Sequence, residues 1–289
     1  MLDLQIFVGD RLVSAHEASV SVFDAGFQSG DAIWEGMRVY NGSVFKLQQH
    51  MTRLEHSAHA LRITLPMDRA GIAAAIEETL ASNDLRDDTH IRLMVSRGIR
   101  KTSGMDPRNA PPKGTLVIIA ERKRVELDPT PQRLRTASIR RSQPQFVDAS
   151  IHHANQLNSI LARLEVLDEL DVDATLMLDA FGYVAEADTA NIFCVSDGVV
   201  RTPCATSCLH GLTRGAVLQL SAAAGHPTHE AQLTLFDFYN ADEVFLTGTV
   251  CELVPVTTID GRRIGDGKPG PVYRQLLDLY RAETQEQTR

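Results

Sequence analysis

The 289-residue sequence contains little lysine and no long apolar run. Only five residues are lysine: Lys46, Lys101, Lys113, Lys123 and Lys268. No stretch reaches the roughly 18 consecutive apolar residues that a membrane-spanning helix needs. The net charge is −8 and no long basic run is present, which argues against nucleic acid as a partner. We therefore expect neither a membrane protein nor a nucleic-acid-binding protein.

The N-terminal residues also lack the positive region and the apolar segment of a signal peptide, so we expect a cytoplasmic protein. In that compartment the four cysteines, Cys194, Cys204, Cys208 and Cys251, are expected to be free thiols. Cys204, Cys208 and the nearby His210 suggest part of a metal site, but two further ligands would be needed and none is evident. We expect no metal.

The composition indicates a globular protein of one large or two ordinary domains, with 43% apolar and 23% charged residues. Between Glu121 and Arg133 the chain becomes charged and contains Pro129 and Pro131, so we place an interdomain connection at residues 121–133. We expect a small N-terminal α/β domain over residues 1–120 and a larger C-terminal α/β domain over residues 134–289.

Local signals predict several elements of the first domain. Asn41-Gly42 lies between two β runs and is typical of a tight hairpin. Residues Ser19–Phe23 alternate between apolar and polar side chains, which predicts a strand. Asp68 is expected to be the N-cap of a helix that continues to about Ala81.

The central stretch from Ser150 to Glu165 reads S-I-H-H-A-N-Q-L-N-S-I-L-A-R-L-E. It begins as a polar turn and then becomes helical. Leu157, Ile160, Leu161 and Leu164 recur at a spacing of three and four residues, which predicts a helix with one buried apolar face.

Further segments surround that stretch in a fixed order. They are D-A-G-F-Q-S-G-D-A-I-W-E-G-M-R-V-Y-N-G from Asp24, H-M-T-R-L-E-H-S-A from His50, G-Y-V-A-E-A-D-T-A-N-I-F from Gly182, C-L-H-G-L-T-R-G-A-V from Cys208 and E-V-F-L-T-G-T from Glu243. From about Phe7 to Ile264 the chain resembles the class IV aminotransferases, the fold type IV pyridoxal 5'-phosphate (PLP) enzymes.

The resemblance implies an α/β (α+β) fold of two domains, like that of the D-amino-acid aminotransferases, and a homodimer. It also implies a PLP or pyridoxamine phosphate (PMP) cofactor. The implied substrates are α-amino acids and 2-oxo acids, either branched-chain or D-configured. Ala32 stands where the family usually has glycine.

The resemblance also implies which residues hold the cofactor. A planar guanidinium at Arg53 suits the phosphate, as do free backbone N–H groups at the start of a helix, although Thr213 could simply cap that helix. A carboxylate at Glu186 would stabilise the protonated pyridine ring. Gln156 replaces a tyrosine common in many members. The implied cofactor-binding residues are Arg53, Asn155, Gln156, Glu186, Leu209, Gly211, Leu212, Thr213 and Thr249.

Four residues of the first domain are candidates for substrate binding by the same resemblance: Trp34, Arg38, Tyr40 and Arg97. Ordinary core packing is the alternative for the two aromatic residues. Arg97 resembles a position that members acting on D-amino acids use for the substrate carboxylate. The neighbouring Arg92 resembles a motif of branched-chain members, and either arginine could equally be a surface charge.

The family's catalytic lysine stands three residues before Asn155, or sometimes four. His152 and Ile151 occupy those two positions here, and none of the five lysines lies in this segment. Histidine cannot make the stable covalent bond to PLP, but its ordinary pKa near 6.5 suits proton transfer. We therefore expect His152 to be the catalytic residue and the cofactor to be bound noncovalently. His153 could replace it, or His152 could be only a hydrogen-bonded residue in a turn.

Three functions follow. The chain could be a family member that keeps PLP binding, with transamination reduced, or with transamination as the parent activity of a chain whose lysine has been changed to histidine. It could instead use the noncovalent cofactor for a lyase or dehydratase reaction, with His152 as the native base. It could also be a non-catalytic binding or interaction protein. The intact phosphate and ring residues argue against the third possibility, because an abandoned site should lose them first.

Overall fold

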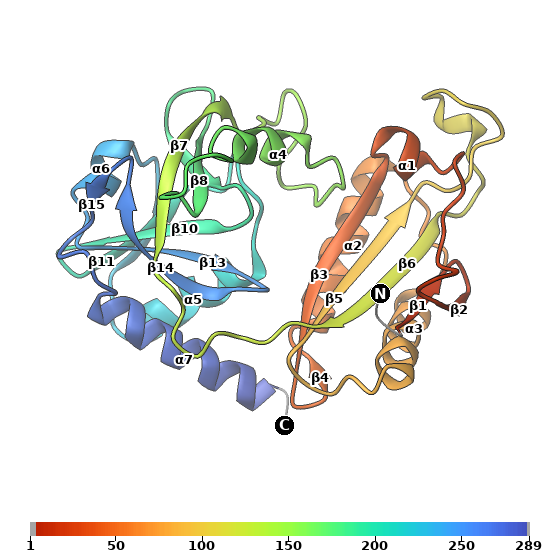
Figure 1. The fold of residues 1–289 in the computed structure, drawn as a ribbon, viewed down its shortest axis with the longest axis horizontal. Coiled ribbons are helices and arrows are strands. Elements are labelled where there is room, and N and C mark those ends of the chain that lie inside the picture. Colours follow the sequence, from red (N-terminus) through yellow and green to blue (C-terminus); the bar gives the residue numbers. More distant parts are fainter. Residues whose placement is uncertain (1–3, 288–289) are drawn as a thin grey trace. The chain divides into compact units, whose positions relative to one another are not determined.

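The computed structural model describes residues 4–287, which form two compact units, each built on its own β-sheet (Figure 1). The mixed α/β, two-domain fold class expected from the sequence is confirmed. The first unit comprises residues 4–124, 151–155 and 284–287, and the second comprises residues 125–150 and 156–283. Among the described residues, no helix is both long and apolar enough to cross a membrane.

The first unit contains a six-stranded antiparallel sheet in the order β2-β1-β6-β5-β3-β4. Helix α2 packs against β3, and α3 packs against β6 and β1. The elements are β1 (Gln5–Val8), β2 (Arg11–Ser14), α1 (Ala25–Ser29), β3 (Ala32–Tyr40), β4 (Ser43–Val44), α2 (Leu47–Leu61), α3 (Arg69–Ser82), β5 (Thr89–Ser96), the short 3-10 helix η1 (Pro107–Asn109) and β6 (Thr115–Arg122).

Two of the three local predictions for this unit are confirmed. Asn41-Gly42 joins β3 to β4, and Asp68 caps α3 by accepting a hydrogen bond from the backbone N–H of Gly71 at 2.8 Å. The prediction of a strand at Ser19–Phe23 is wrong. That stretch is irregular, and the apolar side chains of Val22 and Phe23 are exposed, because no neighbouring strand pairs with it.

The short segment of residues 151–155 belongs to the first unit because it pairs with β3. His153 forms an isolated antiparallel bridge with Ile33. The backbone N–H of Trp34 donates to the carbonyl of His152 at 2.9 Å, and the N–H of Ala154 donates to the carbonyl of Ala32 at 2.8 Å. These bonds place His152 beside the first half of β3. The segment thus belongs to the first unit, although the sequence analysis expected residues 134–289 to form the second domain.

The second unit contains a nine-stranded mixed sheet in the order β12-β11-β10-β13-β14-β7-β8-β9, with β15 paired to β14. The pairs β11–β12, β14–β7 and β7–β8 are parallel. The elements are β7 (Gln132–Arg140), α4 (Leu157–Leu164), β8 (Ala174–Leu178), β9 (Val184–Ala187), β10 (Asn191–Ser196), β11 (Val199–Pro203), α5 (Leu212–Ala223), β12 (Thr228–Ala231), α6 (Leu235–Tyr239), β13 (Glu243–Gly248), β14 (Glu252–Ile259), β15 (Arg262–Arg263) and α7 (Pro271–Gln287).

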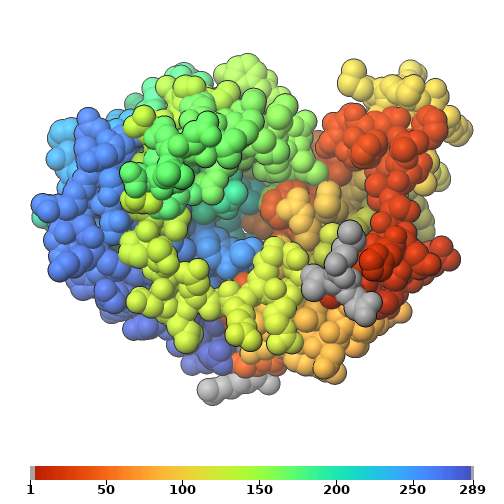
Figure 2. Space-filling view, in the orientation of Figure 1, coloured from red at the N-terminus to blue at the C-terminus, as the bar shows by residue number. Residues whose placement is uncertain are grey.

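Helix α4 forms where the central stretch predicted a helix, but its apolar face is not buried in the chain. Leu157, Ile160, Leu161 and Leu164 are 40–57% exposed, and the residues that turn inward are Ser159 and Ala162. The segment that carries α4, green in Figure 2, lies at the surface of the face shown. The spacing therefore predicted the helix correctly, whereas the prediction that this face packs within the chain is wrong.

Helix α6 provides a direct test of core packing in the second unit. Phe238 is fully buried in the core, whereas Phe236 on the same helix is 73% exposed. Phe238→Ala should lower the free energy of unfolding by about 3–5 kcal/mol, because it leaves a cavity in a close-packed interior. Urea denaturation followed by circular dichroism measures the change.

Phe236→Ala is the matched control, and it should change the free energy of unfolding by less than about 0.5 kcal/mol. Equal losses for the two variants would contradict the assignment of Phe238 to the core.

Candidate functional site

A buried carboxylate, Glu35 of β3, forms the centre of a polar cluster in the first unit. Its side chain is fully buried. Arg53 of α2 donates two hydrogen bonds to it, from Nε to Oε1 at 2.8 Å and from Nη2 to Oε2 at 2.6 Å. The Nδ1 atom of His50 lies 2.7 Å from Oε2, and Nδ1 of His152 lies 3.3 Å from Oε1. Three separate parts of the chain thus meet at one charge.

His152 is held through its backbone as well as its ring. Its N–H donates to Oγ of Ser57 in α2 at 3.1 Å, and its carbonyl accepts from Trp34 in β3. The ring packs on the indole of Trp34, with centroids 4.1 Å apart and planes tilted by 40°. The indole N–H of Trp34 donates to the carbonyl of His153 at 3.1 Å. His152 is therefore a nearly enclosed residue, held through both its backbone and its ring.

Burial and charge set the protonation states of this cluster. Burial would raise the pKa of Glu35, but hydrogen bonds and charge from Arg53, together with the two histidines, hold that pKa well below its ordinary value. Burial lowers the pKa of His152 to about 4, and it also lowers the pKa of His50, while Glu35 opposes both shifts. At neutral pH the cluster therefore holds an ionised carboxylate, a guanidinium and two neutral imidazoles.

The candidate substrate residues lie in different surroundings. Trp34 is in contact with His152, and the guanidinium carbon of Arg92 lies 3.9 Å from the Trp34 ring centroid. Arg38, farther along β3, donates to the carbonyl of Lys123 and lies 5.8 Å from the ring centroid of Tyr40, which is also buried. Of the four substrate candidates, Trp34 is therefore the one in contact with His152.

The fourth candidate, Arg97, is engaged by other groups of the first unit. Its Nε and Nη2 donate to the two carboxylate oxygens of Asp31 at 2.7 and 3.0 Å. It also donates to the carbonyls of Leu61 and Arg62 at the end of α2. In this structure Arg97 therefore fixes the end of a helix, and its role toward a substrate carboxylate stays a prediction.

A second cluster surrounds Glu186 on β9 of the second unit. Its Oε1 accepts from Nε of Arg141 at 2.5 Å, and its Oε2 accepts from Nδ2 of Asn191 at 3.1 Å and from the backbone N–H of Leu209 at 3.2 Å. Burial raises the pKa of Glu186, and the charge of Arg141 opposes that shift. The carboxylate ties β9 and β10 to the loop that leads into α5.

That loop ends at Gly211, the residue that precedes α5. A Cβ atom at Gly211 would lie 2.1 Å from Oδ1 of Asn191, so a side chain there would force Asn191 to move. The first N–H groups of a helix have no partner within the helix, and here they belong to Leu212, Thr213 and the next residue. Thr213 is buried, with its hydroxyl 3.5 Å from that of Tyr280. The segment from Cys208 to Val217 therefore contains the beginning of α5, and the backbone of Leu209 connects it to the Glu186 cluster.

The remaining cofactor candidates are exposed or half-buried residues outside the helices and strands. Asn155 is exposed and lies close to Gly30, where an added Cβ atom would be 3.4 Å from the Cβ atom of Asn155. Gln156 is half-buried and immediately precedes α4. Thr249 is half-buried in the turn between β13 and β14. Their predicted roles toward the cofactor stay predictions.

Three residues that the sequence analysis did not assign belong to these clusters: Glu35, His50 and Arg141. A signal for Glu35 was present, because it stands on the core-facing side of β3 between Ile33 and Met37, where a charge requires a partner. His50 lies one helical turn before Arg53. Arg141 had no comparable signal, since it directly follows β7 beside a second arginine, Arg140.

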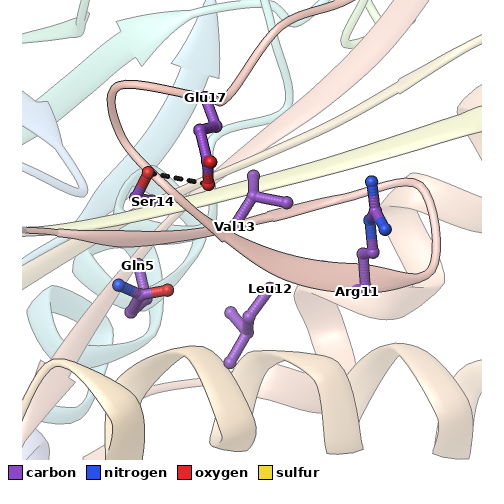
Figure 3. A pocket seen from close by; sticks show the side chains of 6 residues that line it. All are labelled: Gln5, Arg11, Leu12, Val13, Ser14 and Glu17. Carbon is purple, nitrogen blue, oxygen red and sulfur yellow. Dashed lines mark hydrogen bonds between the residues drawn. The ribbon is translucent and has the colours of Figure 1, made fainter.

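A pocket of about 610 Å³ lies beside the β1–β2 hairpin (Figure 3) and holds none of the predicted site residues. It is lined by Gln5, Arg11, Leu12, Val13, Ser14 and Glu17. Among residues 4–287 no group of three or more His, Cys, Asp and Glu side chains is arranged to hold a metal ion, and the four cysteines are free thiols. The two polar clusters are therefore the candidate functional sites.

The buried histidines predict that stability falls in acid. His152 has a folded-state pKa of about 4, and unfolding returns it to about 6.5, so below pH 6.5 the unfolded chain binds a proton that the folded chain does not. Stability should fall as the pH drops from 7 toward 4. For His152 alone the loss between pH 7.5 and pH 5 is on the order of 2 kcal/mol, measured by urea denaturation at both pH values.

His152→Asn should reduce that pH dependence, whereas the same change at the exposed His59 of α2 should leave it as in the parent protein. A His152→Asn variant with an unaltered pH dependence would mean that His152 is already hydrated in the folded chain.

Comparison with known proteins bears on the chain as a whole. The family described as "Amino-transferase class IV" matches residues 32–259. The chain is 45% identical over 97% of its length to "Branched-chain-amino-acid aminotransferase-like protein 2" of Arabidopsis thaliana, and it spans about half of that relative's length. It is 34% identical to a branched-chain-amino-acid aminotransferase of Pseudomonas aeruginosa, over 95% of this chain and 91% of that protein.

Solved structures agree with these relatives. A branched-chain aminotransferase from Thermoproteus uzoniensis, with norvaline, matches with a TM-score of 0.90 and 30% identity over 99% of this chain and 97% of that one. A branched-chain amino acid aminotransferase from Thermobaculum terrenum in its PLP form matches with a TM-score of 0.87 and 27% identity, over 98% and 94%. The chain therefore belongs to the class IV aminotransferase family.

Proposed function

We propose that this chain binds PLP or PMP noncovalently and acts on α-amino acids and 2-oxo acids, with His152 moving protons in place of lysine. The observation that carries the proposal is the Glu35–His152 contact, in which a buried, neutral imidazole lies 3.3 Å from a carboxylate oxygen. The family match over residues 32–259 and the PLP form of the T. terrenum neighbour support the cofactor.

The second unit has a donor set that fits such a cofactor. Amide N–H groups at the start of α5 and the hydroxyls of Thr213 and Thr249 suit a phosphate dianion. The glycine at 211 keeps the backbone there free of a side chain. Glu186 is a buried carboxylate beside a guanidinium, and it suits a protonated ring nitrogen. When bound, the cofactor supplies the electron sink that weakens bonds at the substrate's Cα.

Arg53 stays a proposed phosphate ligand, on the sequence pattern alone. Its Nε and Nη2 atoms bind Glu35 in this structure. The same ion pair keeps Glu35 ionised, so Arg53 contributes to the state of His152 whatever it does toward phosphate.

His152 supplies the part of lysine's role that an imidazole can perform. As a neutral group at pH 7 it can accept a proton from substrate and return it at another atom. It cannot tether the cofactor. Turnover should therefore depend on added cofactor, and transamination, lyase and dehydratase outcomes are distinguished by product. The norvaline complex of the T. uzoniensis neighbour supports an aliphatic amino acid as the substrate. The substrate's configuration and the cytoplasmic location stay predictions.

The first test is a titration of the purified chain with PLP, with mass spectrometry before and after borohydride reduction. We expect saturable binding and no reducible adduct, because no lysine stands at position 152. His152→Lys is the matched variant, and it should acquire one phosphopyridoxyl group at residue 152 after reduction.

An adduct on another lysine of the parent chain would contradict the assignment of His152. Absence of PLP and PMP binding would contradict both enzymatic proposals and favour a binding or interaction protein. If cofactor binds, incubation with L-leucine and with D-alanine, each with 2-oxoglutarate, separates transamination from elimination by the products formed.

We also propose that the chain is a homodimer and that α4 contributes to the interface. The apolar side chains of Ile160 and Leu164 are exposed in the single chain, and an exposed apolar stripe on a helix indicates a partner surface. Light scattering should give twice the chain mass. Ile160→Ser with Leu164→Ser should shift the protein toward monomer, whereas Leu170→Ser, at an exposed residue beyond α4, should not. A monomeric parent protein would refute the proposal.

A further inference from the structure

The two ring nitrogens of His152 have different surroundings. Nδ1 lies 3.3 Å from Oε1 of Glu35. Nε2 has no hydrogen-bond partner among residues 4–287. Glu35 is ionised by its ion pair with Arg53, and an ionised carboxylate only accepts hydrogen bonds. The nitrogen that faces it must therefore carry the hydrogen, which leaves the lone pair on Nε2.

We propose that Glu35 is a positioning residue for His152: it holds the imidazole in the Nδ1–H tautomer, so that Nε2 is the basic atom that exchanges a proton with the amino-acid substrate. This inference rests on the proposed function, in which His152 replaces the family's lysine. It deepens that proposal by assigning a residue that a lysine at position 152 would not require in this role.

The surroundings of the ring keep this orientation. The backbone of His152 is bonded on both sides, to Ser57 through its N–H and to Trp34 through its carbonyl. One face of the imidazole packs on the Trp34 indole. A ring flip would place Nε2 toward Glu35 and would exchange the roles of the two nitrogens. The Glu35 contact is the interaction that decides between these two orientations.

The charges of the cluster also suit proton transfer. A proton that leaves the substrate's Cα binds to the lone pair of Nε2, and the electron pair of the broken C–H bond stays with the substrate. The imidazolium so formed is stabilised by the carboxylate at its Nδ1–H. Arg53 keeps Glu35 from taking the proton itself, because it holds the pKa of that carboxyl far below neutral. Burial lowers the pKa of His152 to about 4, and Glu35 opposes that shift, so Glu35 also increases the basicity of Nε2.

His50 provides a matched control within the same cluster. It contacts the other carboxylate oxygen, Oε2, at 2.7 Å and is also buried. Its removal takes away a hydrogen bond to Glu35 but leaves Oε1 and the contact with His152. A merely structural role of the cluster would make His50 and Glu35 equivalent, whereas a positioning role would not.

The test is the tautomeric state of His152 in the full-length chain, read from the ¹⁵N shifts of its ring nitrogens by NMR with labelled histidine. The His152→Gln variant identifies the signal by its loss. In the parent protein we expect Nδ1 at the shift of a protonated nitrogen and Nε2 at that of a lone-pair nitrogen, from pH 8 down to pH 5.5. This measurement needs neither cofactor nor a variant at position 35.

Two variants then test the cause. Glu35→Gln should abolish the pure Nδ1–H pattern, since the free imidazole prefers the hydrogen on Nε2 and a neutral amide holds Nδ1–H less strongly. His50→Gln should retain the parent pattern. With PLP and L-leucine added, Glu35→Gln should slow exchange of the substrate's α-proton in D₂O by roughly 10²-fold. The exchange rate should change less in His50→Gln.

A parent protein with the hydrogen on Nε2, or with a charged His152 at pH 7, would overturn the inference even if the chain binds PLP. The expected tautomer with no binding of PLP or PMP would refute the proposed function and leave only the Glu35–His152 pairing. If Glu35→Gln does not fold, the shifts of the parent protein and of His50→Gln still decide the assignment.

Discussion

A single buried negative charge organises the first unit. Glu35 has no exposed surface, and an ionised carboxylate in such a place is stable only if it is paired and hydrogen-bonded. Arg53 supplies the ion pair, while His50 and His152 supply two further contacts. β3, α2 and the segment 151–155 therefore meet where the charge lies. Removal of the carboxylate alone would take the ion pair from the half-buried guanidinium of Arg53.

The charge balance of this cluster explains why a histidine fits at position 152. Arg53 already pairs with Glu35, so a neutral third group leaves the resting cluster without net charge. An imidazole can share the carboxylate as a neutral donor, and burial favours that neutral form. In the second unit Glu186 and Arg141 form another neutral pair, and its hydrogen bonds fix the loop that leads into α5. Both clusters thus use a buried ion pair to orient a nearby group.

Short-range signals predicted the elements that depend on a few neighbouring residues. The Asn41-Gly42 hairpin and the Asp68 cap formed as expected, because both depend on local backbone geometry. The prediction for α4 was right about the helix and wrong about the burial of its apolar face. Its spacing determined the helix, but spacing alone does not say what covers the apolar face, and residues 4–287 leave that face 40–57% exposed. Glu35 was present in the motif but received no role, because its partners lie 15 to 117 residues away in the sequence.

At Glu35 of β3, the alternation of apolar residues and the charge of the side chain disagree. Ile33, Met37 and Val39 face the core, so alternation alone would place an apolar residue at 35. A carboxylate there would be strongly destabilising unless other residues were present to pair with it. Those residues include His152. The carboxylate and the histidine are therefore best understood together, since the neutral His152 is a donor to Glu35 only while Arg53 keeps that carboxylate ionised.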